Sequence, residues 1–271
     1  MNESNVFKIW HEHNEPWLEK CRGKALAVTF SAGKDSSVCQ YFLNEVKHQY
    51  NFELRAFMCA FPRHRYTTEE NSRLSAYWEE RGVELTIQIP ETDDEIMEDS
   101  QNPCRPCQDE RKKSLPEIFS YFKRPVSDIV IVSGHSLWDI AAYALNRILA
   151  EKMAIISENS ETLSEKRLLE VSQRFYPFFK MPEGYCVYRP LLYLNQSEIH
   201  SFCRKNTIPV IEEECRYSSW RPKNNLSEFF DRFGYNFNYE TVFNFAKEQL
   251  NIIDLETITS IESGEYLRKH F

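Results

Sequence analysis

The first group of residues that could take part in chemistry is a short polar turn, which follows the apolar segment 25–30. The turn reads Ser31-Ala32-Gly33-Lys34-Asp35-Ser36-Ser37. Its hydroxyl groups can donate hydrogen bonds, Gly33 permits close approach of the backbone, and Lys34 adds a cation. A helix that begins directly after the turn would point its free backbone N–H groups at the same place. The turn therefore predicts a phosphate site, although its spacing differs from the Gly-x-x-x-x-Gly-Lys-Ser/Thr nucleotide loop.

Three of the eight cysteines form a second group with chemical potential. Cys104 and Cys107 make a Cys-x-x-Cys pair with two prolines, which we expect to stiffen a loop whose thiols face one way. Such a pair can bind a metal, form a redox disulfide or carry a persulfide. With Cys215 as a third thiolate, the set would suit an iron–sulfur (4Fe-4S) cluster with one open iron. Burial in the core is expected for the cysteines in apolar or helical contexts, which are Cys39, Cys59, Cys186 and Cys203.

Regular elements must bring these groups together. Apolar runs predict strands at 25–30, 53–59, 83–89, 128–133 and 185–190. Helical spacing predicts helices at 5–20, 36–48, 67–81, 137–157, 161–175 and 195–206. This alternation indicates an α/β fold with a doubly wound, mostly parallel sheet, whose ligands bind at the carboxyl ends of the strands. We expect helical extensions over 1–23 and 226–271 around a central domain over 24–225.

Composition narrows the classes of function. The chain has 271 residues, 42% hydrophobic and 27% charged, which is typical of a globular protein, and no apolar stretch reaches membrane-spanning length. Residues 1–20 lack a basic start and an apolar core, so we expect no secretory signal and a cytoplasmic location. The net charge of −8 argues against a large nucleic-acid partner. Basic clusters at 111–113 and 216–223 leave a local patch open, with solvated surface charge as the alternative.

The polar turn resembles the Ser-Gly-Gly-x-Asp-Ser loop of the PP-loop ATP pyrophosphatase superfamily, with Ala32 in place of the first glycine. The resemblance implies an adenine nucleotide alpha hydrolase-like fold, in which this loop grips the pyrophosphate end of ATP. It also implies that Lys34 and Mg²⁺ neutralise the departing pyrophosphate. By the same resemblance, the residues that bind ATP or organise Mg²⁺ would be Ser31, Ala32, Gly33, Lys34, Asp35, Ser36 and Ser37.

Two further segments extend this resemblance. Relatives carry Gly-His and then a pair of aspartates after the fourth strand, and Gly134 and His135 match the dipeptide. Asp139 matches the second aspartate, whereas Trp138 stands at the first. We therefore expect Gly134, His135 and Asp139 to line the nucleotide cleft. In relatives the end of the second strand meets adenine, a role expected here for Met58, with core packing as the alternative.

The cysteines resemble those of the tRNA 2-thiocytidine synthetase branch, where a Cys-x-x-Cys after the third strand and a late cysteine hold an iron–sulfur cluster. Similar stretches span about residues 24–225. The resemblance implies that Cys104, Cys107 and Cys215 are both metal ligands and catalytic sulfur carriers. Arg105 and Arg111 would favour their thiolate forms by lowering the pKa.

These features favour an ATP-dependent sulfurtransferase. A carbonyl oxygen is a poor leaving group, so ATP would first adenylate it, and a thiolate, persulfide or cluster-bound sulfide would then replace it. AMP and pyrophosphate would be released. A small heterocyclic or nucleotide substrate, such as the guanine type of 6-thioguanine-forming relatives, ranks slightly ahead of tRNA because the chain is acidic. The sulfur donor would be sulfide or a persulfide carrier.

Other functions fit the same loop. Related enzymes join ammonia to the adenylate and form amides or amidines. Phosphosulfate reductases carry a late Glu-Cys, which Glu214-Cys215 echoes. A non-catalytic sensor would bind ATP without turnover. The aromatic segment after residue 224 could pack as a helical cap, form a homodimer contact or cover the substrate.

Overall fold

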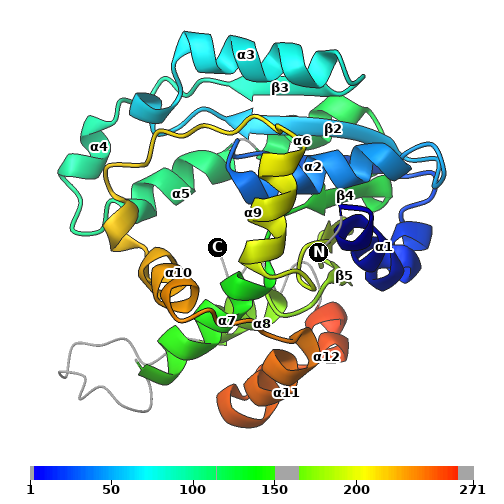
Figure 1. The fold of residues 1–271 in the computed structure, drawn as a ribbon, viewed down its shortest axis with the longest axis vertical. Coiled ribbons are helices and arrows are strands. Elements are labelled where there is room, and N and C mark those ends of the chain that lie inside the picture. Colours follow the sequence, from blue (N-terminus) through cyan, green and yellow to red (C-terminus); the bar gives the residue numbers. More distant parts are fainter. Residues whose placement is uncertain (1–2, 114, 150–164, 262–271) are drawn as a thin grey trace.

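A six-stranded sheet forms the centre of the computed structural model, which describes residues 3–113, 115–149 and 165–261 (Figure 1). The strand order is β3-β2-β1-β4-β6-β5. Every neighbouring pair is parallel except β5 and β6, which are antiparallel. The doubly wound, mostly parallel sheet is thus confirmed, with one short edge strand that the sequence did not predict. The strands are β1 (Ala25–Thr29), β2 (Glu53–Cys59), β3 (Glu84–Gln88), β4 (Ile129–Val132), β5 (Phe178–Lys180) and β6 (Cys186–Tyr188).

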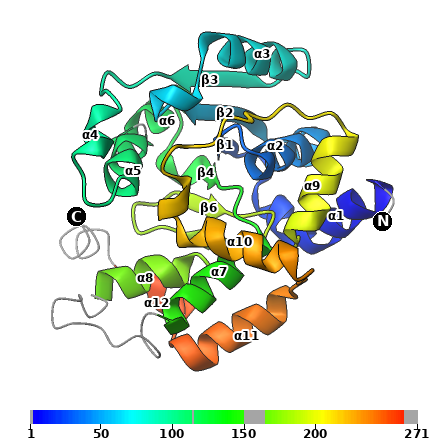
Figure 2. The ribbon, with the colours of Figure 1, turned by 60° about the vertical axis from the view of Figure 1, so that its left-hand side comes forward.

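Helices cover both faces of the sheet because its strands are apolar on both sides (Figure 2). Leu26 and Val28 of β1 point into the main core, which they share with four helices. The alternate residues Ala25 and Ala27 pack against α6 (Leu115–Phe122) on the opposite face. The four helices of the main core are α1 (Glu3–Lys20), α2 (Lys34–Val46), α3 (Thr68–Glu79) and α9 (Gln196–Lys205).

A second core joins the C-terminal helices to α7 (Leu137–Ile148). Trp138 of α7 is buried there, meets the Phe230 ring edge-on at 5.7 Å, and donates from its indole N–H to Asn195 Oδ1 at 3.1 Å. Phe230 and Tyr239 therefore pack as a helical cap, whereas Phe233 remains exposed. The helices that complete this side are α8 (Glu165–Gln173), α10 (Pro222–Arg232), α11 (Tyr239–Leu250) and α12 (Leu255–Ser260).

The chain between β3 and β4 differs from its expected form. Cys104 does not sit in a stiff loop, because it begins α5 (Cys104–Lys113). Pro106 is compatible with this helix, since the first turn needs no backbone N–H for an internal hydrogen bond. The short α4 (Glu95–Glu98) precedes it, and the described 3-10 turns are η1 (Arg63–Arg65), η2 (Val126–Asp128) and η4 (Ser218–Trp220).

Two expected helices extend beyond what the structure describes. The helix predicted at 137–157 is observed as α7 up to Ile148, and that predicted at 161–175 as α8 from Glu165. Residues 150–164 lie outside the described residues. Among the described residues, no helix combines the length and the hydropathy that crossing a bilayer requires.

Candidate active site

The predicted functional segments open into one cavity of about 670 Å³. The cavity lies where β1, β2 and β4 end, as expected for ligand sites of doubly wound sheets. The polar turn, the Cys-x-x-Cys pair and the turn after β4 all contribute side chains to its wall. Those from the predicted set are Ser31, Asp35, Ser36, Cys104, Cys107, Gly134, His135 and Asp139.

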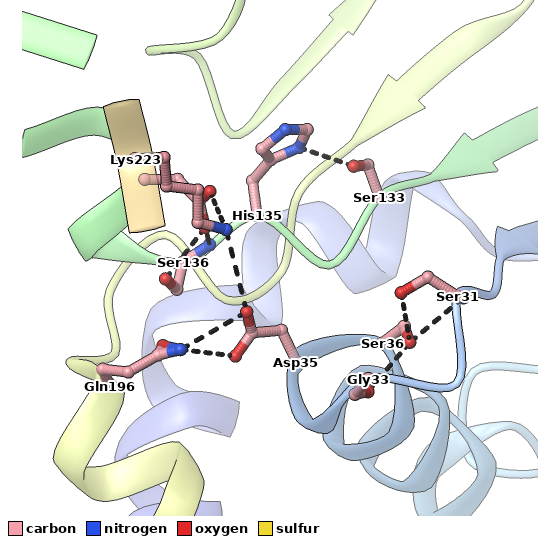
Figure 3. Close-up of polar contacts among 10 residues, drawn as sticks. Ser31, Gly33, Asp35, Ser36, Ser133, His135, Ser136, Gln196 and Lys223 are labelled. Atoms are coloured by element: carbon pink, nitrogen blue, oxygen red, sulfur yellow. Dashed lines mark hydrogen bonds and ion pairs between the residues drawn. The ribbon is translucent and has the colours of Figure 1, made fainter. Parts of the chain in front are cut away.

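Hydrogen bonds within the polar turn hold two hydroxyl groups at the cavity wall (Figure 3). The Ser36 hydroxyl donates to the Gly33 carbonyl at 3.0 Å and accepts from the Ser31 N–H at 3.2 Å. The two serine hydroxyls lie 3.2 Å apart. Gly33 is the N-cap of α2, so the N–H groups of the first turn are available to an anion. The arrangement fits the expected phosphate site.

Other residues of the turn act through the backbone or the core. Ala32 is fully buried and has φ of 54°, a left-handed conformation that costs an alanine about 1–2 kcal/mol. Its carbonyl accepts the Ile211 N–H at 2.8 Å. The buried Ser37 hydroxyl donates to the Pro209 carbonyl at 3.4 Å. Ala32, Gly33, Lys34 and Ser37 are not among the residues that line the cavity.

Gly134 lets the turn after β4 lie directly against α2. A Cβ atom at this position would be 3.0 Å from the Ser36 backbone nitrogen and 3.1 Å from the Asp35 carbonyl carbon. These distances leave no room for a side chain. The close approach places His135 and the polar turn in the same cavity wall.

A cluster of charged groups lies beside the first turn of α2 (Figure 3). Asp139 is buried and accepts from the Ser136 N–H at 2.8 Å and from the Ser136 hydroxyl at 3.0 Å. It also forms an ion pair with Lys223 of α10, whose Nζ lies 4.0 Å from an Asp35 carboxylate oxygen. Gln196 donates to the other Asp35 oxygen at 3.1 Å. The cluster ties α2, α7, α9 and α10 together at the cavity.

Burial and the neighbouring charges set the protonation of this cluster. Burial opposes ionisation of Asp139, but Lys223 and His135 outweigh it and lower the pKa to about 2. Burial raises the pKa of Asp35 despite Lys34 and Lys223. Burial also disfavours charged Lys223, yet the two aspartates overcome it and raise the pKa of the ammonium. Burial lowers the pKa of His135 to about 3, so its imidazole is neutral at pH 7 and pairs with the Ser133 hydroxyl at 2.5 Å.

Three thiols line the cavity, those of Cys59, Cys104 and Cys107, whereas the predicted Cys215 does not line it. Cys104 and Cys107 are 8% and 2% exposed, and Cys215 is close enough to Cys107 to act on its titration. Burial raises the pKa of Cys107 although Arg111 and Arg221 act to lower it, so the arginines stabilise this thiolate but the net lowering expected from the sequence is not found. Cys59, expected in the core, instead lines the cavity next to Cys107.

Histidine and aspartate fix the segment that carries Cys215. Asp94 accepts from the backbone N–H groups of Arg63 and His64 and from the His64 Nδ1–H at 2.7 Å. The other ring nitrogen of His64 accepts the Arg216 N–H at 3.2 Å. Arg216 directly follows Cys215, so this chain of hydrogen bonds holds the late cysteine against the loop after β2.

The cavity is more basic than the acidic chain around it. Its carboxylates, Asp35 and Asp139, face a larger set of cations, which are Arg111, Arg174, Arg221 and Lys223. Arg111 is also anchored, since it donates to the Phe61 carbonyl at 2.8 Å. The two basic clusters of the sequence therefore contribute to the cavity, an environment that suits a polyanion.

Sequence reasoning missed several cavity residues and misplaced one. The side chain of Met58 is fully buried in the main core, and Phe57 and Cys59 present their side chains to the cavity instead. This follows from the alternation of side chains along β2. Period-two spacing could have revealed Cys59. No local sequence pattern identifies Trp220 or Lys223 as site residues, because they reach the cavity only through the packing of the C-terminal segment.

Comparisons with known proteins support the fold. No protein-family model matches the sequence, and no curated protein matches it. The U34-tRNA thiolase NcsA from Methanococcus maripaludis, solved with its iron–sulfur cluster, is similar at 20% identity and a TM-score of 0.66. The match covers 95% of this chain and 87% of the thiolase. An NAD⁺ synthetase from Burkholderia pseudomallei matches at 10% identity and a TM-score of 0.51, over 94% and 91% of the two chains. This chain therefore shares its fold with the thiolase and the NAD⁺ synthetase, which agrees with the fold expected from its sequence.

Proposed function

We propose that this protein is an ATP-dependent sulfurtransferase that replaces a carbonyl oxygen of a heterocycle with sulfur. The observation that carries the proposal is the single cavity that combines the phosphate loop with the thiols of Cys59, Cys104 and Cys107. The likeness to a tRNA thiolase supports it. An enzyme that only transfers phosphate or binds ATP has no need for thiols in the same cavity.

The reaction would proceed in two displacements. The carbonyl oxygen of the substrate attacks the α-phosphorus of ATP, and pyrophosphate leaves from the N-terminus of α2. A sulfur nucleophile then attacks the activated carbon, and the carbon–oxygen bond breaks with AMP as the leaving group. Ser31 and Ser36 would bind the polyphosphate, while neutral His135 can donate or accept a hydrogen bond without adding charge.

The fold implies two cofactors, Mg²⁺ and an iron–sulfur cluster, and the cavity offers residues of a suitable type for each. Carboxylates suit Mg²⁺, and Asp35 and Asp139 are the ones that line the cavity. Thiolates suit an iron–sulfur cluster, which would be held by Cys104, Cys107 and Cys215 and would supply a bound sulfide. Among the described residues, no three His, Cys, Asp or Glu side chains are placed to share a single metal ion. The thiols are therefore proposed as cluster ligands or persulfide carriers rather than as a zinc site.

We propose the class of substrate from the net charge of the chain. A small heterocycle or a free nucleotide agrees with the net charge of −8, because extended contacts with tRNA phosphates normally require a basic surface. Thiolation of tRNA is the second candidate, favoured by the likeness to NcsA. Amide formation is the third, favoured by the likeness to NAD⁺ synthetase. A homodimer and a cytoplasmic location stay predictions.

The test supplies ATP, Mg²⁺ and sulfide under anaerobic conditions to the purified protein. Guanine, guanosine monophosphate and bulk tRNA serve as separate acceptors, and an ammonium arm replaces sulfide. AMP, pyrophosphate and the absorbance of the thiocarbonyl product are measured together. We expect AMP and thiocarbonyl to form in equal amounts with one acceptor. Formation of ADP in place of AMP, or amidated product from ammonium alone, would reject the proposal.

Cysteine variants connect the thiols with the reaction. We expect Cys104→Ser, Cys107→Ser and Cys215→Ser to lose thionation, since each removes a sulfur ligand or carrier. Cys39→Ser is the matched control, because this thiol is buried on α2 and does not line the cavity. Full thionation by all three variants would contradict the role of the thiols. Iron content and colour of the anaerobic protein then distinguish a cluster from a persulfide.

A further inference from the structure

The lysine that the sequence predicted at the polyphosphate of ATP is not among the residues that line the cavity. The charge of Lys34 acts on Asp35, as that of Lys223 does, but it also acts on Cys203, a buried residue of α9. The loop residue that sequence would choose to neutralise pyrophosphate is therefore poorly placed for that contact.

Lys223 lies where that cation is needed. Its side chain lines the cavity together with Ser31 and Ser36, and its Nζ is 4.0 Å from Asp35 in the first turn of α2 (Figure 3). Anions bind at this end of a helix because the free N–H groups and the helix dipole point there. The ammonium thus stands beside the same helix terminus as the two serine hydroxyls.

We propose that Lys223, rather than Lys34, is the residue whose ammonium binds the polyphosphate of ATP, an inference that rests on the proposed use of ATP. A lysine ammonium has three N–H donors. Lys223 forms an ion pair with Asp139, and the Asp35 oxygen at 4.0 Å is beyond hydrogen-bond distance. Donor capacity is left for a phosphate oxygen, while Asp139 fixes the position of the side chain.

The contacts of Trp138 position α10, and with it Lys223, at the cavity. Trp138 packs against Phe230 of α10 and donates to Asn195. This packing anchors the helix that begins at Pro222, next to Lys223. A cation held in this way makes the cavity more favourable to a tetra-anionic nucleotide.

The experiment measures the affinities of ATP, pyrophosphate and AMP by titration calorimetry in EDTA, so that no metal masks the lysine. We expect Lys223→Met to weaken ATP and pyrophosphate binding about 10- to 100-fold, the loss typical of a charged hydrogen bond. AMP affinity should change less than about twofold, because AMP lacks the outer phosphates. Lys223→Arg should retain part of the ATP affinity. Lys34→Met, the competing variant, should weaken ATP binding at least about fivefold less than Lys223→Met.

A double variant separates direct contact from general electrostatics. Lys223→Met leaves Asp139 buried without its partner, which itself could repel ATP or destabilise the fold. Lys223→Met with Asp139→Asn removes both charges of the pair, and thermal unfolding verifies its folding. Under the proposal, the double variant still binds ATP and pyrophosphate weakly. Recovery of wild-type affinity, or a greater loss in Lys34→Met, would overturn it. Failure of the wild type to bind ATP would instead reject the proposed function.

Discussion

The sharpest structural prediction concerns the close approach of Gly134 to α2. In Gly134→Ala, the added methyl would lie 3.0 Å from the Ser36 nitrogen and 3.1 Å from both the Asp35 carbonyl carbon and the Ser36 Cα. Comfortable separations between such atoms are about 3.5–4.0 Å. All three atoms belong to the backbone, so no flexible side chain can turn away. The strain must move either the turn after β4 or the first turn of α2.

We expect this strain to have two measurable effects. Overpacking of a tight site costs about 1–3 kcal/mol, so the free energy of unfolding in urea should fall by that amount. A shift of the Ser36 amide would also weaken one hydrogen bond to a phosphate, worth about 1.5–3 kcal/mol, so ATP affinity should fall about 10- to 100-fold. Adenosine, which has no phosphate, should bind with nearly unchanged affinity.

Gly33→Ala is the matched control for stability. Its Cβ would meet only the Ser31 hydroxyl oxygen at 3.6 Å, an ordinary contact, and its φ of −84° suits alanine. We expect its free energy of unfolding to stay within about 1 kcal/mol of the wild type, because no backbone atom must move. If Gly134→Ala matched the wild type in both stability and ATP affinity, the close approach would not be what positions the polar turn.

Two other predictions address the histidines. Because His135 has a folded pKa of about 3 against about 6.5 when unfolded, the unfolded state binds more protons between these values. Stability should therefore fall by about 2 kcal/mol from pH 7 to pH 5, and His135→Gln should lose this slope in urea unfolding; equal slopes would contradict the neutral buried imidazole. His64→Ala breaks the link from Asp94 to the Arg216 N–H, so Cys215 should react faster with iodoacetamide. Cys39, fully buried on α2, is the internal control in mass-spectrometric mapping, and an unchanged rate at Cys215 would show that other contacts hold the segment.

Local sequence identified most of the elements because their periodicity is local. Short continuous apolar runs such as those of β1 and β4, which are buried on both faces, indicated parallel strands, and the polar turn indicated the N-terminus of α2. The prolines of the Cys-x-x-Cys segment led to the wrong prediction of a loop, because proline is common both in loops and in the first turn of a helix. The edge strand β5 was missed because three residues are too short to show a period.

By itself the sequence indicated the polar turn before α2, most of the strands and helices, and the cysteines proposed as sulfur carriers, since each depends on neighbours in the chain. Only the tertiary structure decided which charges meet. Lys223 and Asp35 are far apart in sequence, and the packing of Phe230 on Trp138 brings them to 4.0 Å. Lys34 does not line the cavity, whereas Cys59 does so because side chains alternate along β2. The chemical type of each side chain can be read from the sequence. Its burial and its electrostatic partners depend on contacts between segments that are distant in the sequence, and local patterns do not predict those contacts.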